Sequence, residues 1–173
     1  PLALPYLAPV LSPMLAHCKL MKEQNPGAAC VFIGPCISKK EEADLYGWTD
    51  AVLTFEELEQ MMAEEGVSFP ELPAEQAEGK RARFFPTEGG VIKSMDRDPR
   101  FHYLAVTGVE NCIEAIKEIE AGQLENCFVE LSACEGSCIN GPAIRHHHAT
   151  STLLSETKVD EFAGQDEFAT PAP

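Results

Sequence analysis

The chain has 173 residues, 45% of them hydrophobic and 24% charged, which is enough for one sizeable domain or two small lobes around a buried core. Its net charge of -15 argues against wrapping nucleic acid or lying on an anionic membrane, because both need basic patches, and is compatible with docking a basic partner. The sequence contains neither a signal segment nor a run of about 18 apolar residues that would span a membrane. Seven cysteines in such a chain predict reduced thiols in a cytoplasm, some of them metal ligands, rather than a disulfide framework.

The first half of the chain predicts two helices and two strands. Apolar residues recurring at helical spacing indicate each helix, and the short apolar runs "CVFI" and "AVLT" indicate the strands. Thr54 and Glu57 form a capping box at the start of the second helix, which Gly66 ends. In chain order these elements cover residues 7–23, 30–33, 51–54 and 55–65.

After an exposed excursion over residues 67–82, the second half repeats the alternation. "PTEGGVIKSM" indicates a turn that feeds a short helix, and "HYLAVTG" and "CFVEL" indicate strands. Thr107 and Glu110 predict a second capping box, before a helix that Gly122 ends. A last helix is expected near 151–163, followed by a frayed tail. Strands alternating with helices predict an α/β fold, a sandwich that contains a parallel sheet with flanking helices.

Two cysteine-containing turns follow predicted strands. Cys36 lies three residues beyond Ile33, and Cys134 lies three residues beyond Leu131. Ligands of open parallel sheets bind outside the carboxyl ends of the strands, so the two turns can converge on one site if their strands are near each other in the sheet.

The spacing of Cys134 and Cys138 favours metal ligation. Residues four apart share one face of a helical turn, and Gly136 and Gly141 allow the backbone to approach a bulky inorganic group. Zinc ribbons use paired Cys-x-x-Cys knuckles, which are absent from these turns, whereas iron–sulfur clusters accept varied spacings. The alternative is a pair of buried structural thiols.

The other cysteines fall on apolar faces or within strands, which indicates core packing. The three histidines at 146–148 stand in a segment typical of solvated chain, so metal ligation there is the weaker interpretation. The cysteines assigned to the core are Cys18, Cys30, Cys112 and Cys127.

Two segments resemble two of the three signature motifs of the iron-only (FeFe) hydrogenase large subunit, C-terminal region. In the first, the Pro-Cys motif, the family pattern Pro-Cys-x-x-Lys-x-x-Glu is matched by Pro35, Cys36, Lys39 and Glu42. In the second, the Glu-Ala-Cys motif, the pattern Glu-x-x-Ala-Cys-x-x-x-Cys-x-x-Gly is matched by Glu130, Ala133, Cys134, Cys138 and Gly141. "EGGV" (88–91) is similar to the family's glycine turn, and the resemblance covers most of residues 1–143.

The resemblance implies a partial iron-only hydrogenase fold and an H-cluster, which is a 4Fe-4S cubane joined through a cysteine sulfur to a two-iron site that carries CO and cyanide. It implies that Cys36 and Cys134 ligate the cubane, that Cys138 both ligates it and bridges to the two-iron site, and that Lys39 hydrogen-bonds a cyanide. The implied reaction is reversible reduction of protons to hydrogen, with electrons from a ferredoxin-type iron–sulfur domain or another carrier. The positions that would line the cofactor are Pro35, Glu42, Ala133 and Gly141.

Two positions depart from the pattern of catalytic members. Those members carry a methionine before the Pro-Cys pair and another two residues before the first cysteine of the later motif, where this chain has Gly34 and Ser132. The family's glycine run is replaced by Gly141-Pro142-Ala143. Such changes alter packing and polarity near a two-iron site and resemble the divergent, sensory branch, in which PAS or other signalling domains are attached.

The family's first motif, which supplies the fourth cubane ligand, would lie upstream of Pro1. The chain is therefore expected to be truncated, with a partial H-cluster domain over 1–144 and a C-terminal helix and tail over 145–173. In that form we expect it to be inactive, with an incomplete or absent cluster. Two alternatives stay open, a non-catalytic iron–sulfur binding or assembly protein and a metal-free interaction module.

Overall fold

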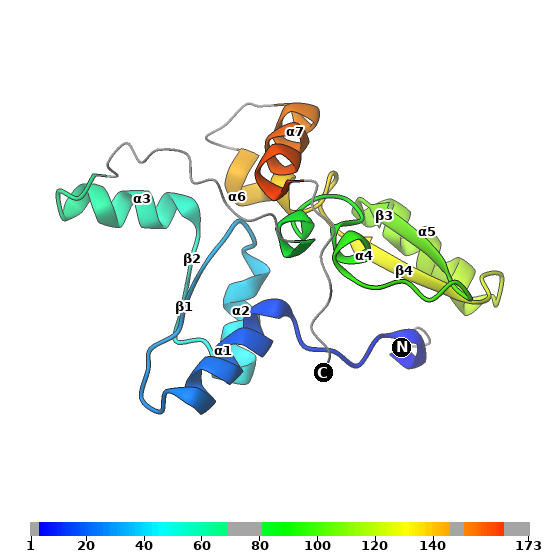
Figure 1. Ribbon diagram of the computed structural model, residues 1–173, viewed down its shortest axis with the longest axis horizontal. Coiled ribbons are helices and arrows are strands. Elements are labelled where there is room, and N and C mark those ends of the chain that lie inside the picture. Colours follow the sequence, from blue (N-terminus) through cyan, green and yellow to red (C-terminus); the bar gives the residue numbers. More distant parts are fainter. Residues whose placement is uncertain (1–3, 69–80, 146–150, 165–173) are drawn as a thin grey trace. The chain divides into compact units, whose positions relative to one another are not determined.

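The computed structural model describes residues 4–68, 81–145 and 151–164, and these divide into two compact units (Figure 1). The N-terminal unit contains residues 6–68 together with 142–145. The C-terminal unit contains residues 81–141 and 151–164, with residues 4 and 5. The histidines at 146–148 lie outside the described residues.

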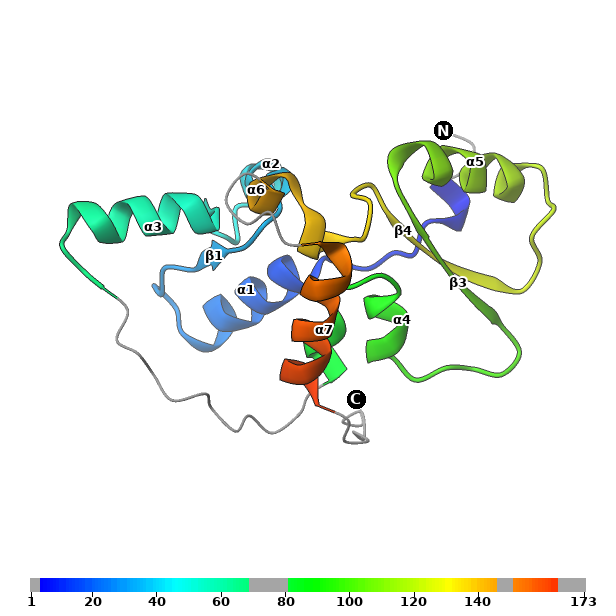
Figure 2. The same cartoon turned by 90° about the horizontal axis from the view of Figure 1, so that it is seen from above.

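The N-terminal unit is built on one β-α-β motif, seen in Figures 1 and 2. Strands β1 and β2 pair in parallel, with Val31 opposite Ala51 and Ile33 opposite Leu53. A parallel pair needs a crossover, and here it is the helix α2, which packs on β2. In chain order the elements are α1 (Pro13–Gln24), β1 (Val31–Ile33), α2 (Ser38–Tyr46), β2 (Ala51–Leu53), α3 (Phe55–Glu64) and α6 (Pro142–Arg145).

The core of this unit lies between α1 and α2. Met14 and Leu15 of α1 are 4% and 1% exposed, and both pack with the buried Ala43 of α2. Helix α1 begins at Pro13, not at residue 7, because the Ser12 side chain accepts a hydrogen bond from the Leu15 amide and proline favours the first helical position. Partly buried side chains complete the core, namely Cys18, Phe32, Trp48 and Val52.

The capping box at the start of α3 is confirmed. The Thr54 hydroxyl accepts from the Glu57 amide at 3.2 Å, and the Glu57 carboxylate accepts from the Thr54 amide at 2.8 Å. Helix α2 was not predicted, because the segment "SKKEEADLY" has almost no apolar periodicity and buries only Ala43.

The C-terminal unit repeats the β-α-β arrangement at greater length. Strands β3 and β4 pair in parallel from His102 opposite Cys127 to Thr107 opposite Ser132, and the crossover helix α5 packs on both. Cys112 and Ala115 are the buried residues of α5. In chain order the elements are η2 (Arg81–Phe84), α4 (Gly90–Ser94), β3 (His102–Thr107), α5 (Val109–Glu120), β4 (Cys127–Ser132), η3 (Cys138–Asn140) and α7 (Thr152–Ala163). The short helix η1 (Leu4–Tyr6) is divided, with residues 4 and 5 in this unit and residue 6 in the N-terminal unit.

The predicted capping box at Thr107 and Glu110 is wrong. The N-cap of α5 is Gly108, with φ 88° and ψ 140° and no side-chain cap. A cap at Thr107 would need Gly108 to be the first helical residue, but Gly108 has positive φ and its amide still donates to the Ser132 carbonyl, so the helix begins one residue later.

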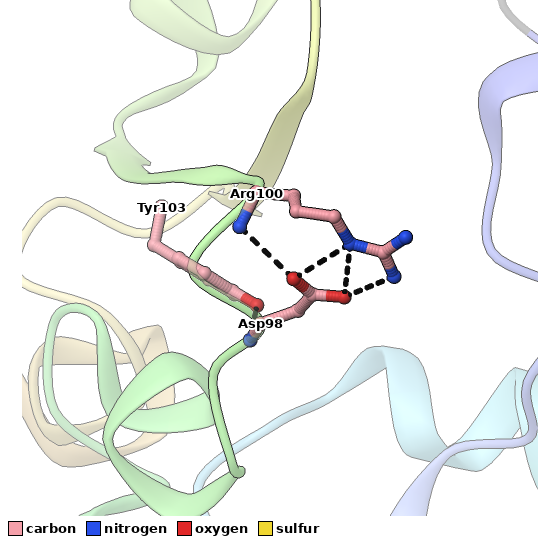
Figure 3. Close-up of polar contacts among 3 residues, drawn as sticks. All are labelled: Asp98, Arg100 and Tyr103. Atoms are coloured by element: carbon pink, nitrogen blue, oxygen red, sulfur yellow. Dashed lines mark hydrogen bonds and ion pairs between the residues drawn. The ribbon is translucent and has the colours of Figure 1, made fainter.

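A polar turn precedes β3 (Figure 3). The Asp98 amide donates to the Tyr103 hydroxyl at 2.7 Å, and the Asp98 carboxylate accepts from the Arg100 backbone amide and guanidinium. These bonds from Arg100 hold the pKa of Asp98 below its ordinary value. The turn thus sets where β3 begins beside β4.

The α/β fold with parallel strands is as predicted, with the strands divided between two two-stranded sheets. The longest described helices have 12 residues, and none of the described helices could span a bilayer.

Thr54→Ala should destabilise α3 by about 1 kcal/mol, because the Glu57 amide loses its acceptor. Thr54→Ser keeps the hydroxyl and is the control, with urea unfolding followed by circular dichroism as the measurement. Hydrogen bonds from Lys40 and then from the Thr54 amide hold the pKa of Glu57 below its ordinary value. The ionised Glu57 carboxylate therefore stabilises the fold at a pH above its ordinary pKa, and this stabilisation is lost as the pH falls through the lowered pKa. Equal stability of the two variants would show that the cap contributes nothing.

Candidate metal centre

The predicted site residues occupy two turns, one in each unit. Cys36 lies in the loop between β1 and α2, and Cys134 and Cys138 follow β4. Both turns leave the carboxyl end of a parallel strand, as predicted, but β1 and β4 belong to different sheets. Convergence of all three cysteines on one site therefore stays a prediction.

The Pro-Cys motif is organised by the first turn of α2. The Cys36 carbonyl accepts from the Lys39 amide at 3.3 Å, and its sulfur lies 3.0 Å from the Ser38 hydroxyl. Lys39 and Glu42 are three residues apart on α2, so their side chains meet in a half-buried ion pair. The motif thus contains a partly exposed thiol and, three residues later, a lysine whose ammonium group is paired with Glu42.

Gly34, where catalytic members carry methionine, is buried against an aromatic ring. A Cβ placed on Gly34 would lie 2.8 Å and 2.9 Å from two atoms of the Phe32 ring, which packs against the α1–α2 core. Any larger residue at this position therefore requires the Phe32 ring to move.

The Glu-Ala-Cys motif forms a tight turn rather than a helical one. The Ser137 amide donates to the Cys134 carbonyl at 3.0 Å, with Gly136 at φ 71°, and η3 then begins at Cys138. The expectation that Cys134 and Cys138 share one face of a helical turn is therefore wrong, because glycine allows the chain to reverse between them. Both cysteines are partly exposed.

Ser137 carries backbone strain between the two cysteines. Its φ of 64° and ψ of -156° lie in a region that is essentially restricted to glycine, and the residue is only 2% exposed. Its hydroxyl lies 3.3 Å from that of Ser132, the residue at the other methionine position of catalytic members. At each position where catalytic members carry methionine, a neighbouring side chain is therefore in contact. The Phe32 ring lies against Gly34, and the Ser137 hydroxyl lies near that of Ser132.

Glu130 joins its motif to the glycine turn. It is 7% exposed on β4, and its carboxylate accepts from the Ile92 amide in the first turn of α4 at 3.0 Å. Gly90 begins that helix where a Cβ would lie 2.0 Å from the Phe84 carbonyl oxygen, so only glycine fits. Both segments were predicted as motifs from the sequence, but their contact was not. The signal for it was an acidic residue inside an apolar strand.

The donor chemistry of the motif cysteines fits iron. All seven cysteines are present as thiols, and thiolate sulfur is the usual ligand of iron–sulfur clusters. Cys112 is buried and Cys18 packs on the core, as predicted, and the Cys30, Cys112 and Cys127 thiols each donate to a backbone carbonyl. Burial is the largest cause of a raised pKa at Cys30, which opposes the anionic form that ligates metals.

Among the described residues, no group of three or more His, Cys, Asp and Glu side chains is placed to hold an ion. A shared site of Cys36, Cys134 and Cys138 stays a prediction.

Residues 1–142 match the model of the family "Iron only hydrogenase large subunit, C-terminal domain". The chain belongs to this family. The match includes every residue of the Pro-Cys and Glu-Ala-Cys motifs. No curated protein matches the chain significantly.

Solved structures show the same fold. A variant of the FeFe-hydrogenase HydA1 from Chlamydomonas reinhardtii is 17% identical with a TM-score of 0.64, and 91% of this chain covers 60% of that one. An FeFe-hydrogenase studied for oxygen inactivation at the 2Fe subcluster is 18% identical with a TM-score of 0.62, covering 91% and 59%. The HydA structure that revealed stepwise H-cluster assembly is 17% identical with a TM-score of 0.55, covering 84% and 57%. The chain spans about three fifths of the length of these structures.

Glu130→Leu should cost about 1–3 kcal/mol of unfolding free energy, because the Ile92 amide stays buried without its acceptor. Glu130→Gln retains an oxygen that can accept the same hydrogen bond and should cost less. Urea unfolding of both variants is the measurement, and a leucine variant as stable as the glutamine variant would contradict this role.

Ser137→Gly should be more stable than Ser137→Ala by roughly 1–3 kcal/mol. Both variants lose the hydroxyl that faces Ser132, so the difference between them isolates the backbone strain at φ 64°. Thermal unfolding measures it, and equal stabilities would show that the turn is not strained.

Proposed function

We propose that this chain is a cluster-binding domain of a hydrogenase-like protein in which Cys36, Cys134 and Cys138 are thiolate ligands of one 4Fe-4S cubane. The observation that carries the proposal is the family match over residues 1–142, which contains both cysteine motifs in order. All three thiols are partly exposed at strand ends rather than buried in the core, which suits ligation. The fourth cubane position is left for another thiol.

The finer part of the proposal assigns Cys138 as the sulfur that also bridges to a two-iron subsite, which completes an H-cluster. When bound, that cluster supplies the reversible interconversion of protons and hydrogen. Lys39 is proposed to donate to an anionic ligand of the subsite. Its ion pair with Glu42 supports this role, because the carboxylate holds the ammonium group in a fixed orientation.

Hydrogen sensing is the activity we favour for the parent protein. Both methionine positions of catalytic members are changed, and each change has a local counterpart, the Phe32 ring at Gly34 and the Ser137 hydroxyl at Ser132. A polar hydroxyl pair in place of a thioether changes the packing and hydrogen bonding available near a two-iron site, which are the properties that tune its potential.

The expected setting is the cytoplasm, with electrons exchanged through a ferredoxin-type domain or another carrier and with PAS or other signalling domains in the parent. The net charge of -15 favours a carrier that presents basic residues. A second candidate function, an iron–sulfur binding or assembly protein without hydrogen chemistry, would need the cubane ligands but not Lys39.

After anaerobic reconstitution with iron, sulfide and a small thiol to fill the fourth position, the chain should hold about four iron and four sulfide. Cys36→Ser, Cys134→Ser and Cys138→Ser should each lower the iron content, because each removes one ligand. Cys127→Ser is the matched control, since its thiol bonds the Glu125 carbonyl outside both motifs. Iron and sulfide analysis with EPR of the reduced protein is the measurement.

Loss of iron in the control as well as in the motif variants would indicate non-specific thiol binding. No iron in the unmodified chain would overturn the proposal in favour of a metal-free module. A hydrogen-dependent EPR change after insertion of the two-iron site, lost in Lys39→Met, would separate hydrogen chemistry from simple cubane binding.

A further inference from the structure

Helix α7 packs on the turn that carries Cys134 and Cys138. The Asn140 side chain, in η3, donates a hydrogen bond to the hydroxyl of Thr152, the first residue of α7. A Cβ placed on Gly136 would lie 2.8 Å from the Asn140 amide nitrogen and 2.9 Å from the Thr152 methyl carbon. Thr152 and Asn140 therefore close directly over the glycine at which the turn reverses.

The other end of α7 is held by η2. The Arg83 guanidinium donates to the Phe162 carbonyl at 2.9 Å and lies 4.2 Å from the centre of the Phe162 ring. Ala163 is fully buried beside this contact in the sequence. Helix α7 thus has one anchor at each end, and both anchors lie within the C-terminal unit.

The two anchors are also joined to each other. The Ile139 amide of η3 donates to the Pro86 carbonyl at 3.1 Å, just after η2, and Ile139 is 7% exposed. The elements η2, η3 and α7 therefore form a closed set of contacts around the cysteine turn. Of the three, only α7 lies beyond residue 142, where the family match ends.

We propose that α7 is a positioning element that holds the Cys134–Cys138 turn in its ligating shape, so that movement at the C-terminal end of the chain alters cluster retention. The inference rests on the proposed function for its link to a cluster. The mechanism is mechanical: releasing Thr152 frees Asn140, and the strained turn at Ser137 can then relax. Thr152 and Asn140 are positioning residues, since neither supplies a ligand.

Hydrogen exchange of the full chain without metal tests whether α7 stabilises the Cys134–Cys138 turn. The amides of Ser137, Ile139, Asn140 and Gly141 are all hydrogen-bonded, so their exchange reports opening of the turn. Thr152→Val removes the hydroxyl and keeps the branched shape, and exchange at these amides should become about fivefold faster. Thr157→Val is the matched control, because that hydroxyl donates to the Leu153 carbonyl of its own helix.

Arg83→Gln releases the far end of α7 and should act in the same direction, which protects the test against a local defect at Thr152. Unchanged exchange in both variants would show that α7 does not stabilise the Cys134–Cys138 turn. After reconstitution, both variants should also lose iron to a chelator several-fold faster than the control. Faster exchange with unchanged iron release would overturn the positioning role, leaving only a structural contact.

Failure of the proposed function gives a different pattern. If the unmodified chain binds no iron, the cluster proposal fails. Faster exchange in Thr152→Val would still show that α7 stabilises the Cys134–Cys138 turn.

Discussion

Parallel strand pairing is the constraint from which the placement of both motifs follows. Two parallel strands cannot be joined by a tight turn, so each pair in this chain carries a helical crossover, α2 in one unit and α5 in the other. That connection leaves loops at the carboxyl ends of the strands, where backbone groups are not used by the sheet. Cys36 stands in the loop between β1 and its crossover helix α2, whereas Cys134 stands in the turn that follows β4, the second strand of its pair. Both thiols therefore lie beyond the carboxyl end of a strand and outside the hydrogen-bonded pairs.

Several motif residues that are not cysteines have structural roles of their own. Glu130 is a buried carboxylate on β4, and its hydrogen bond to the Ile92 amide fixes α4 beside the strand that ends at the cysteine turn. Gly90 permits that approach, because a side chain there would collide with the Phe84 carbonyl. Lys39 and Glu42 likewise pair on the first turn of α2. Motif residues that are not ligands can therefore act by orienting the turns that carry the cysteines.

Much of the fold could be predicted from local pattern. All four strands were placed to within one or two residues, and the Thr54 capping box was predicted because both partners are local. Helix α2 was missed since it is charged along most of its length and buries only Ala43, so periodicity carries no signal. The Thr107 capping box failed because the Gly108 amide is bonded to the carbonyl of Ser132, a residue distant in sequence, so Gly108 is not the first helical residue that the box requires. Division of the strands between two sheets depends on tertiary contacts that local pattern does not encode.

The candidate site shows the same division between local and distant information. The ligand types and their order were readable from the two motifs, whereas the shape of the Cys134–Cys138 turn was not, since i,i+4 spacing is equally compatible with a glycine reversal. The structure adds that the two departures from catalytic members are locally compensated. Phe32 fills the space at Gly34, and the Ser137 hydroxyl faces Ser132. Methionine in place of Gly34 would therefore collide with the Phe32 ring. Methionine in place of Ser132 would remove the hydroxyl that the buried Ser137 hydroxyl faces. Each residue and its neighbour therefore have to be substituted together.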